Sequence, residues 1–314
     1  MRDAFSDALV RLAREDSRVL LLTGDHGYAL FDDFRRHCEG QYINAGIAEQ
    51  NMVGMAAGLA RTGFRPFVYG LSAFVPVRVL EQIKLDVAHD DLPVVFLGDG
   101  AGFVYSHLGT SHQSTEDIAC TRAIPRLSVL SPADRFEMGV CMDAAYALNG
   151  PVYLRMGKAD RGDVHQQEIS KFEPGSLLLV RKGNPQMPGV IATGSMVRTA
   201  LDVCRDLDLT VWSAPWIKPL KSVDVFDAAK SSAGLVVMEE HSTMGGLGAA
   251  VAEITSELYP SRVMRIGVPD RFSAHCGTYD YLLKEHGLDL DTVSAGIKRF
   301  AASVEAFEPV HPSL

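Results

Sequence analysis

Short apolar segments of three or four residues alternate with longer segments of helical periodicity along this chain. In the first half the apolar segments are residues 19–22, 66–69, 94–97 and 152–154. Apolar runs of this length are typical of strands buried on both faces of a sheet. The intervening segments predict helices at residues 2–15, 49–61, 77–89 and 134–148, the last opened by the start signal Ser131-Pro132-Ala133-Asp134. The pattern therefore predicts an α/β fold with a mainly parallel sheet and helices on both faces.

The same alternation recurs on a smaller scale in the second half. Strands are predicted at residues 190–192, 209–211, 235–238 and 263–266, and helices at 196–205, 222–229 and 248–258. Residues 158–188 are polar and contain several Gly and Pro residues, which is typical of a linker, with one short strand at 177–180. We therefore predict a first domain at residues 1–157, a linker at 158–188 and a smaller α/β domain at 189–314.

Charge and composition narrow the class of protein. The net charge is −9 and the sequence has no block of Lys and Arg, which argues against nucleic acid or an anionic membrane as the main partner. The longest apolar runs are too short to span a bilayer, and residues 1–6 lack the apolar core of a signal peptide, so we expect a cytoplasmic protein. The five cysteines are scattered, which favours reduced thiols over a disulfide framework or a zinc site.

One acid is notable for its place in a predicted helix. Glu49 occupies the first turn of a helix that is rich in small residues, namely Gly54, Ala56, Ala57, Gly58 and Ala60. Small residues allow another backbone, a second subunit or a flat ligand to approach closely. Glu49 is therefore a candidate for a functional interface, and stabilisation of the helix dipole by a first-turn acid is the simpler alternative.

Several short motifs follow one another in a fixed order. In the first half they are Ala48-Glu49-Gln50, Ser72-Ala73-Phe74, Gly109-Thr110-Ser111-His112-Gln113 with Glu116-Asp117, Ile124-Pro125 and Ser131-Pro132-Ala133-Asp134. In the second half they are Glu239-Glu240-His241, Met244-Gly245-Gly246-Leu247-Gly248, Gly267-Val268-Pro269-Asp270 and Gly287-Leu288-Asp289. In this order the motifs resemble the pyrimidine-binding and C-terminal domains of the transketolase family, which includes the related 1-deoxyxylulose-5-phosphate synthases. The resemblance covers essentially all 314 residues.

The resemblance implies a thiamine diphosphate enzyme whose diphosphate-binding domain is absent from this chain. We therefore expect a split transketolase in which an N-terminal partner subunit carries that domain and the Mg²⁺ (or Ca²⁺) ion. Thiamine diphosphate would bind between the two chains, and α2β2 is the expected assembly. No metal ligand is expected on this chain.

Two glycine-rich segments match cofactor motifs only in part. Gly98-Asp99-Gly100 could begin the metal–diphosphate motif of thiamine diphosphate enzymes, but residues 124–134 lack the Asn that should follow. Gly245-Gly246-Leu247-Gly248 is similar to a dinucleotide-binding turn, but Val251 stands in place of the third glycine and the preceding loop is long. We expect neither segment to bind its cofactor.

The family's cofactor roles fall on residues of the first domain. The resemblance assigns Glu49 to a hydrogen bond with N1' of the aminopyrimidine, which relays the proton removed from the thiazolium C2. It assigns Phe74 to stacking on that ring and His112 to the donor's oxygens. Asp25 falls where transketolases carry an acid near the thiazolium ring. From the pattern alone, Phe74 would be a core residue, Asp25 a turn residue and His112 a solvated loop residue.

Basic residues near the end of the first domain are candidates for binding a sugar phosphate. Arg155 and Lys158 follow the last predicted strand, where the resemblance places a basic side chain on the phosphate. Arg2, in the opening helix, is a weaker candidate for the same role.

One loop departs from the family pattern. Leu108 replaces an Asp that contacts a substrate hydroxyl, and a family His is missing near Gly100. Loss of a hydroxyl partner changes selectivity by roughly 1–3 kcal/mol, so we expect an unusual substrate. His107 either compensates for the loss or has a structural role.

The main hypothesis is the small subunit of a transketolase that moves a two-carbon ketol unit from a ketose phosphate to an acceptor. One alternative is a decarboxylating enzyme that resembles the β subunit of 2-oxoacid dehydrogenases, or a deoxyxylulose phosphate synthase relative. A non-catalytic scaffold is a further alternative, against which Glu49, Phe74 and His112 together argue. The second domain is expected to serve assembly, with Glu240 and His241 in structural roles.

Overall fold

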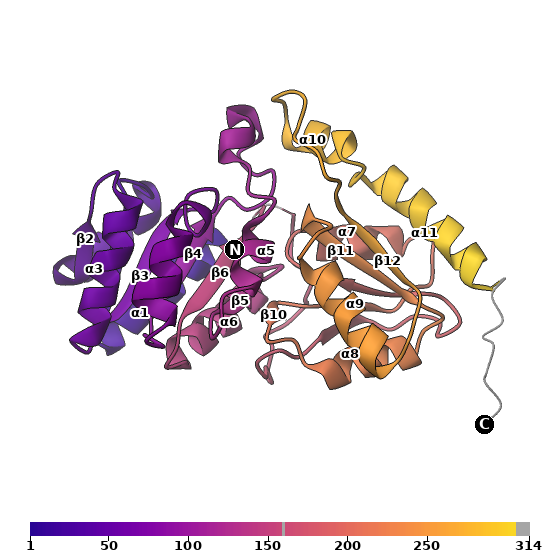
Figure 1. Ribbon diagram of the computed structural model, residues 1–314, viewed down its shortest axis with the longest axis horizontal. Helices are drawn as coiled ribbons and strands as arrows, with labels where there is room; N and C mark the ends of the chain where they lie inside the picture. Colours follow the sequence, from indigo (N-terminus) through magenta and orange to yellow (C-terminus); the bar gives the residue numbers. More distant parts are fainter. Residues whose placement is uncertain (159–160, 306–314) are drawn as a thin grey trace.

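A seven-stranded sheet organises the N-terminal half of the chain (Figure 1). The computed structural model describes residues 1–158 and 161–305. The strand order is β10-β5-β6-β4-β3-β1-β2, and the pairs are parallel apart from β10 with β5. Every residue of β1, β4 and β6 is buried, as their continuous apolar runs predict. The strands are β1 (Val19–Thr23), β2 (Tyr42–Asn44), β3 (Arg65–Leu71), β4 (Val95–Asp99), β5 (Ser128–Leu130), β6 (Val152–Met156) and β10 (Trp216–Lys218).

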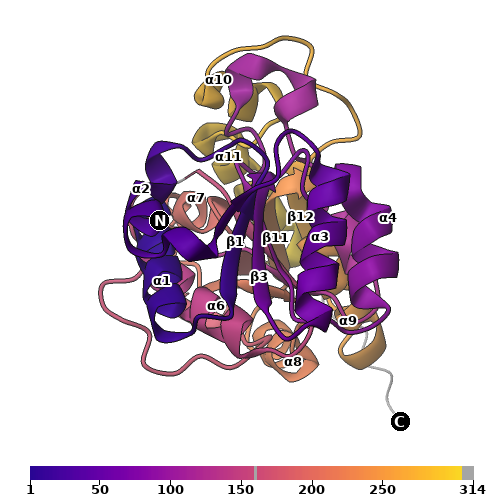
Figure 2. The same ribbon diagram turned by 90° about the vertical axis from the view of Figure 1, so that its left-hand side faces the viewer.

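Helices cover both faces of this sheet (Figure 2). α1 (Arg2–Glu15), α2 (Asp32–His37) and α6 (Arg135–Ala147) pack on one face. α3 (Glu49–Arg61) and the segment around α4 (Leu80–Gln82) pack on the other, and the short α5 (Asp117–Arg122) follows β4. α6 begins where the sequence predicts because the Asp134 carboxylate accepts hydrogen bonds from the backbone N–H groups of Phe136 and Glu137.

The helix predicted at residues 77–89 contains three kinds of turn. A 3₁₀ turn (Val77–Val79) leads into α4, and a π-helical segment (Ile83–Ala88) follows. The N–H of His89 donates to the carbonyl of Lys84 at 3.0 Å, five residues back. The segment is therefore helical as predicted, but its last turn is wider than an α-helical turn.

A five-stranded sheet organises the C-terminal half, in the order β12-β11-β8-β9-β7. β7 is antiparallel to β9, and the other pairs are parallel. The two α/β units predicted from the sequence are thereby confirmed. The strands are β7 (Leu178–Arg181), β8 (Gly189–Ala192), β9 (Val211–Ser213), β11 (Leu235–Ser242) and β12 (Val263–Val268), and the helices are α7 (Met196–Val203), α8 (Ser222–Lys230), α9 (Leu247–Leu258), α10 (Tyr279–Glu285) and α11 (Leu290–Glu305).

Two strands join sheets across the predicted division of the chain. β7 comes from the segment predicted as a linker and forms the edge of the second sheet. β10 comes from the second half and pairs with β5 at the edge of the first sheet, where Trp216 is buried in the core on the α1 and α6 side. The division at residues 1–157, 158–188 and 189–314 stays a prediction, and sheet pairing joins the two halves in addition to the chain connection.

All five cysteines are free thiols. Within residues 1–158 and 161–305, no helix combines the length and the apolar character needed to cross a membrane.

Candidate active site

Glu49 lies at the start of α3, beside the loop that follows β1. Only 4% of its surface is exposed. A Cβ atom on Gly24 would lie 3.3 Å from the carbonyl oxygen of Gly46 and 3.9 Å from Cγ of Glu49, so the absence of a side chain at Gly24 allows this close approach. The carboxylate is thus held near the carboxyl ends of the parallel strands, the edge at which open α/β sheets bind ligands.

Three side chains connect Glu49 to the predicted substrate loop. Nη1 of Arg78 donates to Oε1 of Glu49 at 2.9 Å, and the guanidinium carbon lies 4.0 Å from the centroid of the Phe74 ring. The Phe74 ring meets the His112 ring at 5.3 Å between centroids, with an interplanar angle of 66°. We call Glu49, Phe74, Arg78 and His112 the Glu49 cluster. The structure therefore brings together three residues that the sequence singled out separately.

Arg78 was not predicted from the sequence as a site residue. A lone arginine in a predicted helix has the pattern of a solvent-exposed residue, and 45% of this side chain is indeed exposed. The available signal was its spacing from Phe74, since residues four apart in a helical turn share one face. The N–H of Arg78 donates to the carbonyl of Phe74 at 3.2 Å, which fixes that spacing in the structure.

Asp25 lies in the loop that follows β1, next to Gly24. Its φ of +62° is a left-handed conformation that Asp tolerates better than most residues. The side-chain amide of Asn44 and the hydroxyl of Tyr28 donate to Oδ1 at 3.1 Å and 3.0 Å. These two hydrogen bonds lower the pKa of Asp25, so the side chain is anionic at neutral pH. The structure shows that Asp25 lies in a turn, and its role as an acid beside a thiazolium ring stays a prediction.

A second polar cluster lies at the end of β4. Oδ2 of Asp99 accepts hydrogen bonds from the hydroxyls of Tyr69 and Tyr105 at 2.8 Å and 3.0 Å, and it lies 3.5 Å from Nη2 of Arg2. A Cβ atom on Gly100 would lie 1.9 Å from the Tyr105 ring. Tyr105 therefore occupies the space that a histidine at position 100 would need.

Arg155 is not placed to bind a phosphate, contrary to the prediction. Its side chain is 2% exposed, Nε donates to Oδ2 of Asp117 at 2.8 Å, and Nη2 donates to the carbonyl of Glu240 at 2.7 Å. The hydroxyl of Tyr153 donates to the same Asp117 oxygen at 2.6 Å. The prediction was wrong because β6 extends to Met156, so Arg155 is still inside the strand and faces the packed interior.

Lys158 lies beyond the end of β6 and is partly exposed. Its Nζ is 5.5 Å from the centroid of the Tyr279 ring, and the guanidinium carbon of Arg161 is 6.0 Å from the same centroid. With Arg155 buried, Lys158 and the half-exposed Arg2 remain as the predicted phosphate ligands.

His107 and Leu108 lie in a short 3₁₀ turn (Ser106–Leu108) that projects from the first half beside the loop before α10 (Figure 1). Both side chains are exposed, Leu108 by 55%. Leu108, which is predicted to replace a substrate-binding Asp of the family, is therefore an exposed apolar side chain.

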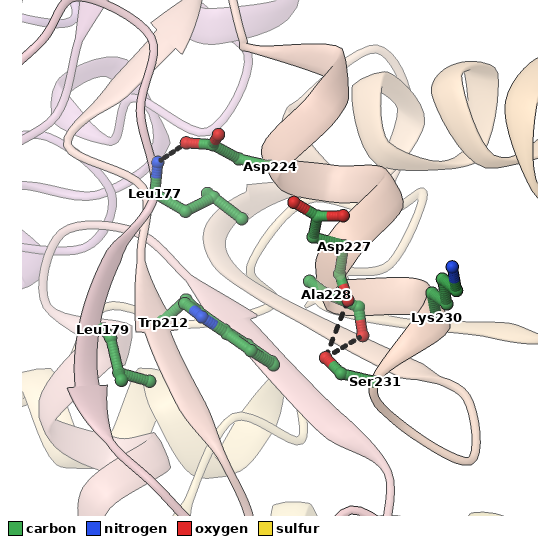
Figure 3. Close-up of a pocket in the computed structure, with 8 residues that line it drawn as sticks. All are labelled: Leu177, Leu179, Trp212, Asp224, Asp227, Ala228, Lys230 and Ser231. Atoms are coloured by element: carbon green, nitrogen blue, oxygen red, sulfur yellow. Dashed lines mark hydrogen bonds between the residues drawn. The ribbon is translucent and has the colours of Figure 1, made fainter.

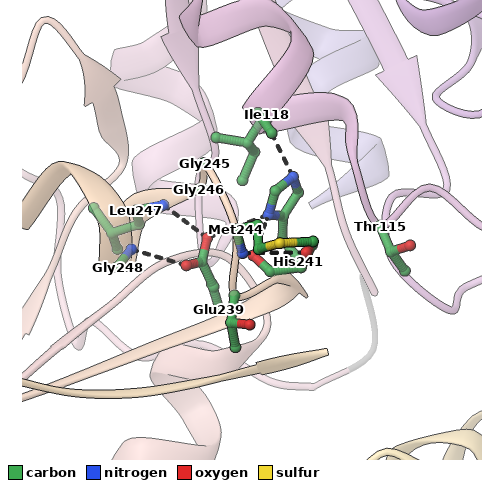
Figure 4. Close-up of polar contacts among 12 residues, drawn as sticks. Thr115, Ile118, Glu239, His241, Met244, Gly245, Gly246, Leu247 and Gly248 are labelled. Atoms are coloured by element: carbon green, nitrogen blue, oxygen red, sulfur yellow. Dashed lines mark hydrogen bonds and ion pairs between the residues drawn. The ribbon is translucent and has the colours of Figure 1, made fainter. Parts of the chain in front are cut away.

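Glu239 and His241 make structural contacts (Figure 4). The Glu239 carboxylate accepts hydrogen bonds from the N–H groups of Leu247 and Gly248 at the start of α9, at 2.7 Å and 2.8 Å. Nε2 of His241 accepts from the N–H of Ala119 at 3.2 Å, which joins β11 to α5. Burial raises the pKa of Glu239 to about 7 and lowers the pKa of His241 to about 4, so the histidine is neutral at physiological pH.

An open groove of about 630 Å³ lies in the second half, between β7, β9 and α8 (Figure 3). It is lined by Trp212 and Leu179 on one side and by residues of α8 on the other. None of the predicted site residues lines this groove.

Comparison with known proteins identifies the two halves of the chain. Residues 1–162 match the family model of the transketolase pyrimidine-binding domain, and residues 184–293 match that of the transketolase C-terminal domain. The chain belongs to the transketolase family. One subunit of the apulose-4-phosphate transketolase of Phocaeicola vulgatus is 33% identical over 302 residues, which are 93% of this chain and 94% of that protein. The SqwH subunit of the 6-deoxy-6-sulfo-D-fructose transketolase of Clostridium sp. (strain MSTE9) is 33% identical over 294 residues, 92% of this chain and 90% of that protein.

A solved structure described as a split gene transketolase, inactive β4 tetramer, has the same fold. Its TM-score is 0.85 at 32% identity, over 96% of this chain and 97% of that chain. The transketolase family and the α/β fold predicted from the sequence are therefore confirmed.

The Glu49 cluster suits the aminopyrimidine of thiamine diphosphate, the cofactor of transketolases. Glu49 offers a buried carboxylate oxygen, and Phe74 offers a partly buried aromatic face. Arg78 contacts both, and its guanidinium is a flat cation that bears N–H donors. An aminopyrimidine is likewise flat and bears N–H donors, so the same two surfaces fit it. In the part of the chain that the structure describes, no group of three or more His, Cys, Asp or Glu side chains is arranged to hold a metal ion.

Proposed function

We propose that this chain is the C-terminal subunit of a split, thiamine diphosphate-dependent transketolase. It transfers a two-carbon ketol unit from a ketose phosphate to an acceptor. The observation that carries the proposal is the buried Glu49 carboxylate beside the Phe74 ring, in a chain that matches transketolase domains in both halves. An N-terminal partner subunit carries the diphosphate-binding domain and the Mg²⁺ or Ca²⁺ ion, the assembly is α2β2, and the enzyme is cytoplasmic.

Glu49 and Phe74 would hold the aminopyrimidine. When bound, thiamine diphosphate supplies the carbanion chemistry of the reaction. Glu49 exchanges a proton with N1', and its burial strengthens that hydrogen bond by excluding water. Phe74 orients the ring by stacking. Asp25, whose pKa is lowered by its hydrogen bonds with Asn44 and Tyr28, would be the acid near the positive thiazolium ring.

His112 and the basic residues act on the sugar. His112 lies at the outer edge of the Glu49 cluster, with Nδ1 3.0 Å from Oγ of Ser111, and it exchanges protons with the donor's oxygens. Lys158 and Arg2 bind the phosphate. The exposed Leu108 offers no hydrogen bond to a substrate hydroxyl, so the preferred substrate lacks the hydroxyl that the family's Asp contacts.

The test is to purify the chain together with the product of its neighbouring gene and to screen donor and acceptor pairs by mass spectrometry. With thiamine diphosphate and Mg²⁺, we expect a product two carbons longer than the acceptor. Consumption of pyruvate with release of carbon dioxide would instead favour the decarboxylating alternatives. A complex that binds the cofactor but turns over no donor would favour a scaffold.

A further inference from the structure

The loop that carries His112 is held by the second half of the chain. We call residues 102–115 the His112 loop. At one end the N–H of Phe103 donates to Oε1 of Glu240 at 2.7 Å, and at the other the N–H of Ser242 donates to the carbonyl of Thr115 at 2.7 Å. Both contacts are made by β11, so the base of the His112 loop is fixed to the second sheet.

Gln113, the neighbour of His112 in the chain, continues this contact. Its side chain is only 6% exposed. The hydroxyl of Ser273 donates to Oε1 of Gln113 at 2.9 Å, and Nε2 of His286 lies 2.9 Å from the same hydroxyl oxygen. Because Ser273 has a single hydroxyl proton and gives it to Gln113, the His286 ring donates from Nε2. Burial keeps the pKa of His286 below its ordinary value, which agrees with a neutral ring.

His286 also contacts the opposite end of the His112 loop. Its ring stacks on Phe103 at 4.8 Å between centroids, with an interplanar angle of 18°. A small pocket of about 40 Å³ lies beside Phe103, Gln113, Ser273 and His286, and the exposed Phe272 also lines it. Side chains packed this closely have little room to rearrange.

We propose that the second domain positions His112 through the chain of contacts from His286 to Ser273 to Gln113. Ser273 and His286 are positioning residues, since they act on the loop and not on the substrate. The proposal rests on the proposed function, in which His112 moves protons at the donor's oxygens. It assigns the C-terminal domain a part in the chemistry as well as in assembly.

The contacts of His112 make this support necessary. The imidazole packs edge to face on Phe74 and lies beside Ser111, which is itself exposed on the same turn. Gln113 is the first residue after His112 whose side chain is buried, so it fixes where the backbone of His112 lies. A displacement of about 1 Å at a catalytic group can lower the rate by roughly 10²-fold.

The experiment uses the enzyme assembled with its partner subunit and thiamine diphosphate. Ser273→Ala removes the hydroxyl, and His286→Phe keeps the stacking on Phe103 but loses the donor. We expect each variant to lower kcat about tenfold, with assembly and cofactor affinity unchanged, and Ser273→Thr to restore most of the rate. The matched control is Ser256→Ala, the same change at an exposed position of α9.

A second readout does not depend on turnover. The NMR signals of the His112 imidazole, recorded on the isolated chain, should shift in Ser273→Ala and stay unchanged in Ser256→Ala. The inference would be overturned if the wild-type enzyme transfers the ketol unit and Ser273→Ala has the same kinetics and the same NMR signals as Ser256→Ala. Shifted signals in the isolated chain, together with an assembled enzyme that shows no transfer, would support the contact and contradict the proposed function alone.

Discussion

At the scale of residues, Arg78 occupies the two surfaces, on Glu49 and Phe74, that the proposed function assigns to the aminopyrimidine. Its guanidinium pairs with Glu49 and lies 4.0 Å above Phe74, so a second flat group cannot occupy that face at the same time. The side chain is 45% exposed and can turn towards solvent. A half-exposed ion pair contributes about 0.2–1 kcal/mol and an exposed cation–π contact about 0.5–1 kcal/mol. Cofactor binding therefore has to offset roughly 1–2 kcal/mol to displace Arg78.

Replacement of Arg78 should consequently strengthen cofactor binding. We expect Arg78→Ala to lower the Kd of the assembled enzyme for thiamine diphosphate by up to about tenfold, since about 1.4 kcal/mol corresponds to a factor of ten. Isothermal titration calorimetry measures the change. Arg61→Ala is the matched control, because Arg61 is another half-exposed arginine paired with a carboxylate, that of Asp90. Weaker binding by Arg78→Ala would make Arg78 a cofactor ligand and not a competitor.

Replacement of Glu49 tests the proton relay. Glu49→Gln keeps the shape and one hydrogen-bonding oxygen but cannot exchange the proton, so we expect kcat to fall by about 10²–10⁴-fold. Assembly with the partner subunit should be retained, as measured by size-exclusion chromatography. Glu81→Gln, at an exposed position of α4, should be fully active. Near-normal turnover of Glu49→Gln would remove Glu49 from the mechanism.

At the scale of elements, the end of β6 separates two basic residues with different roles. Arg155 is inside the strand and pairs with buried Asp117, whereas Lys158 is beyond its end. Arg155→Met should destabilise the fold by about 3–5 kcal/mol because it leaves the Asp117 carboxylate buried without a counter-charge. Lys158→Met loses the cation–π contact with Tyr279 and should destabilise the fold by only about 1 kcal/mol, but it should raise KM for a phosphorylated donor. Urea unfolding and donor kinetics distinguish the two; equal stability of both variants would contradict this assignment.

Glu137, in the first turn of α6, gives the fold a pH dependence. Burial raises its pKa from 4.5 to about 7. The folded chain therefore binds this proton more tightly than the unfolded chain, and the associated stability is present below pH 4.5 and lost as the pH rises through about 7. Glu137→Gln should lose less stability than the wild type between about pH 5 and pH 8 in thermal unfolding. Asp143→Asn, at an exposed position of the same helix, should have the same pH dependence of stability as the wild type. If the stability of Glu137→Gln changes with pH in parallel with that of the wild type, the prediction is refuted.

The elements that the sequence predicted are those whose signal is local. α1 and α3 have the predicted bounds because apolar periodicity and start residues define them within one segment. β10 was not predicted because three residues carry no periodicity and the strand exists only by pairing with β5. Arg155 was misassigned for a similar reason, since the sequence does not show whether an arginine after an apolar run still belongs to the buried strand or lies just beyond its end.

At the scale of the whole molecule, large apolar side chains are exposed on segments that carry or neighbour residues of the Glu49 cluster and the His112 loop. Ile47, two residues before Glu49, is 76% exposed. On the loop between β12 and α10, Phe272 is 83% exposed, and Leu108 of the His112 loop is also exposed. Large exposed apolar side chains near a site favour an interface with another protein. This agrees with a partner subunit that covers the cofactor, and the sequence could indicate it only through the resemblance.

The central claim is that this chain holds half of a thiamine diphosphate site. The most direct test is calorimetric titration of thiamine diphosphate with Mg²⁺ into the chain alone, the partner subunit alone and their equimolar mixture. We predict tight binding by the mixture only, with one cofactor bound per pair of chains. Tight, magnesium-dependent binding by the isolated chain would contradict the claim.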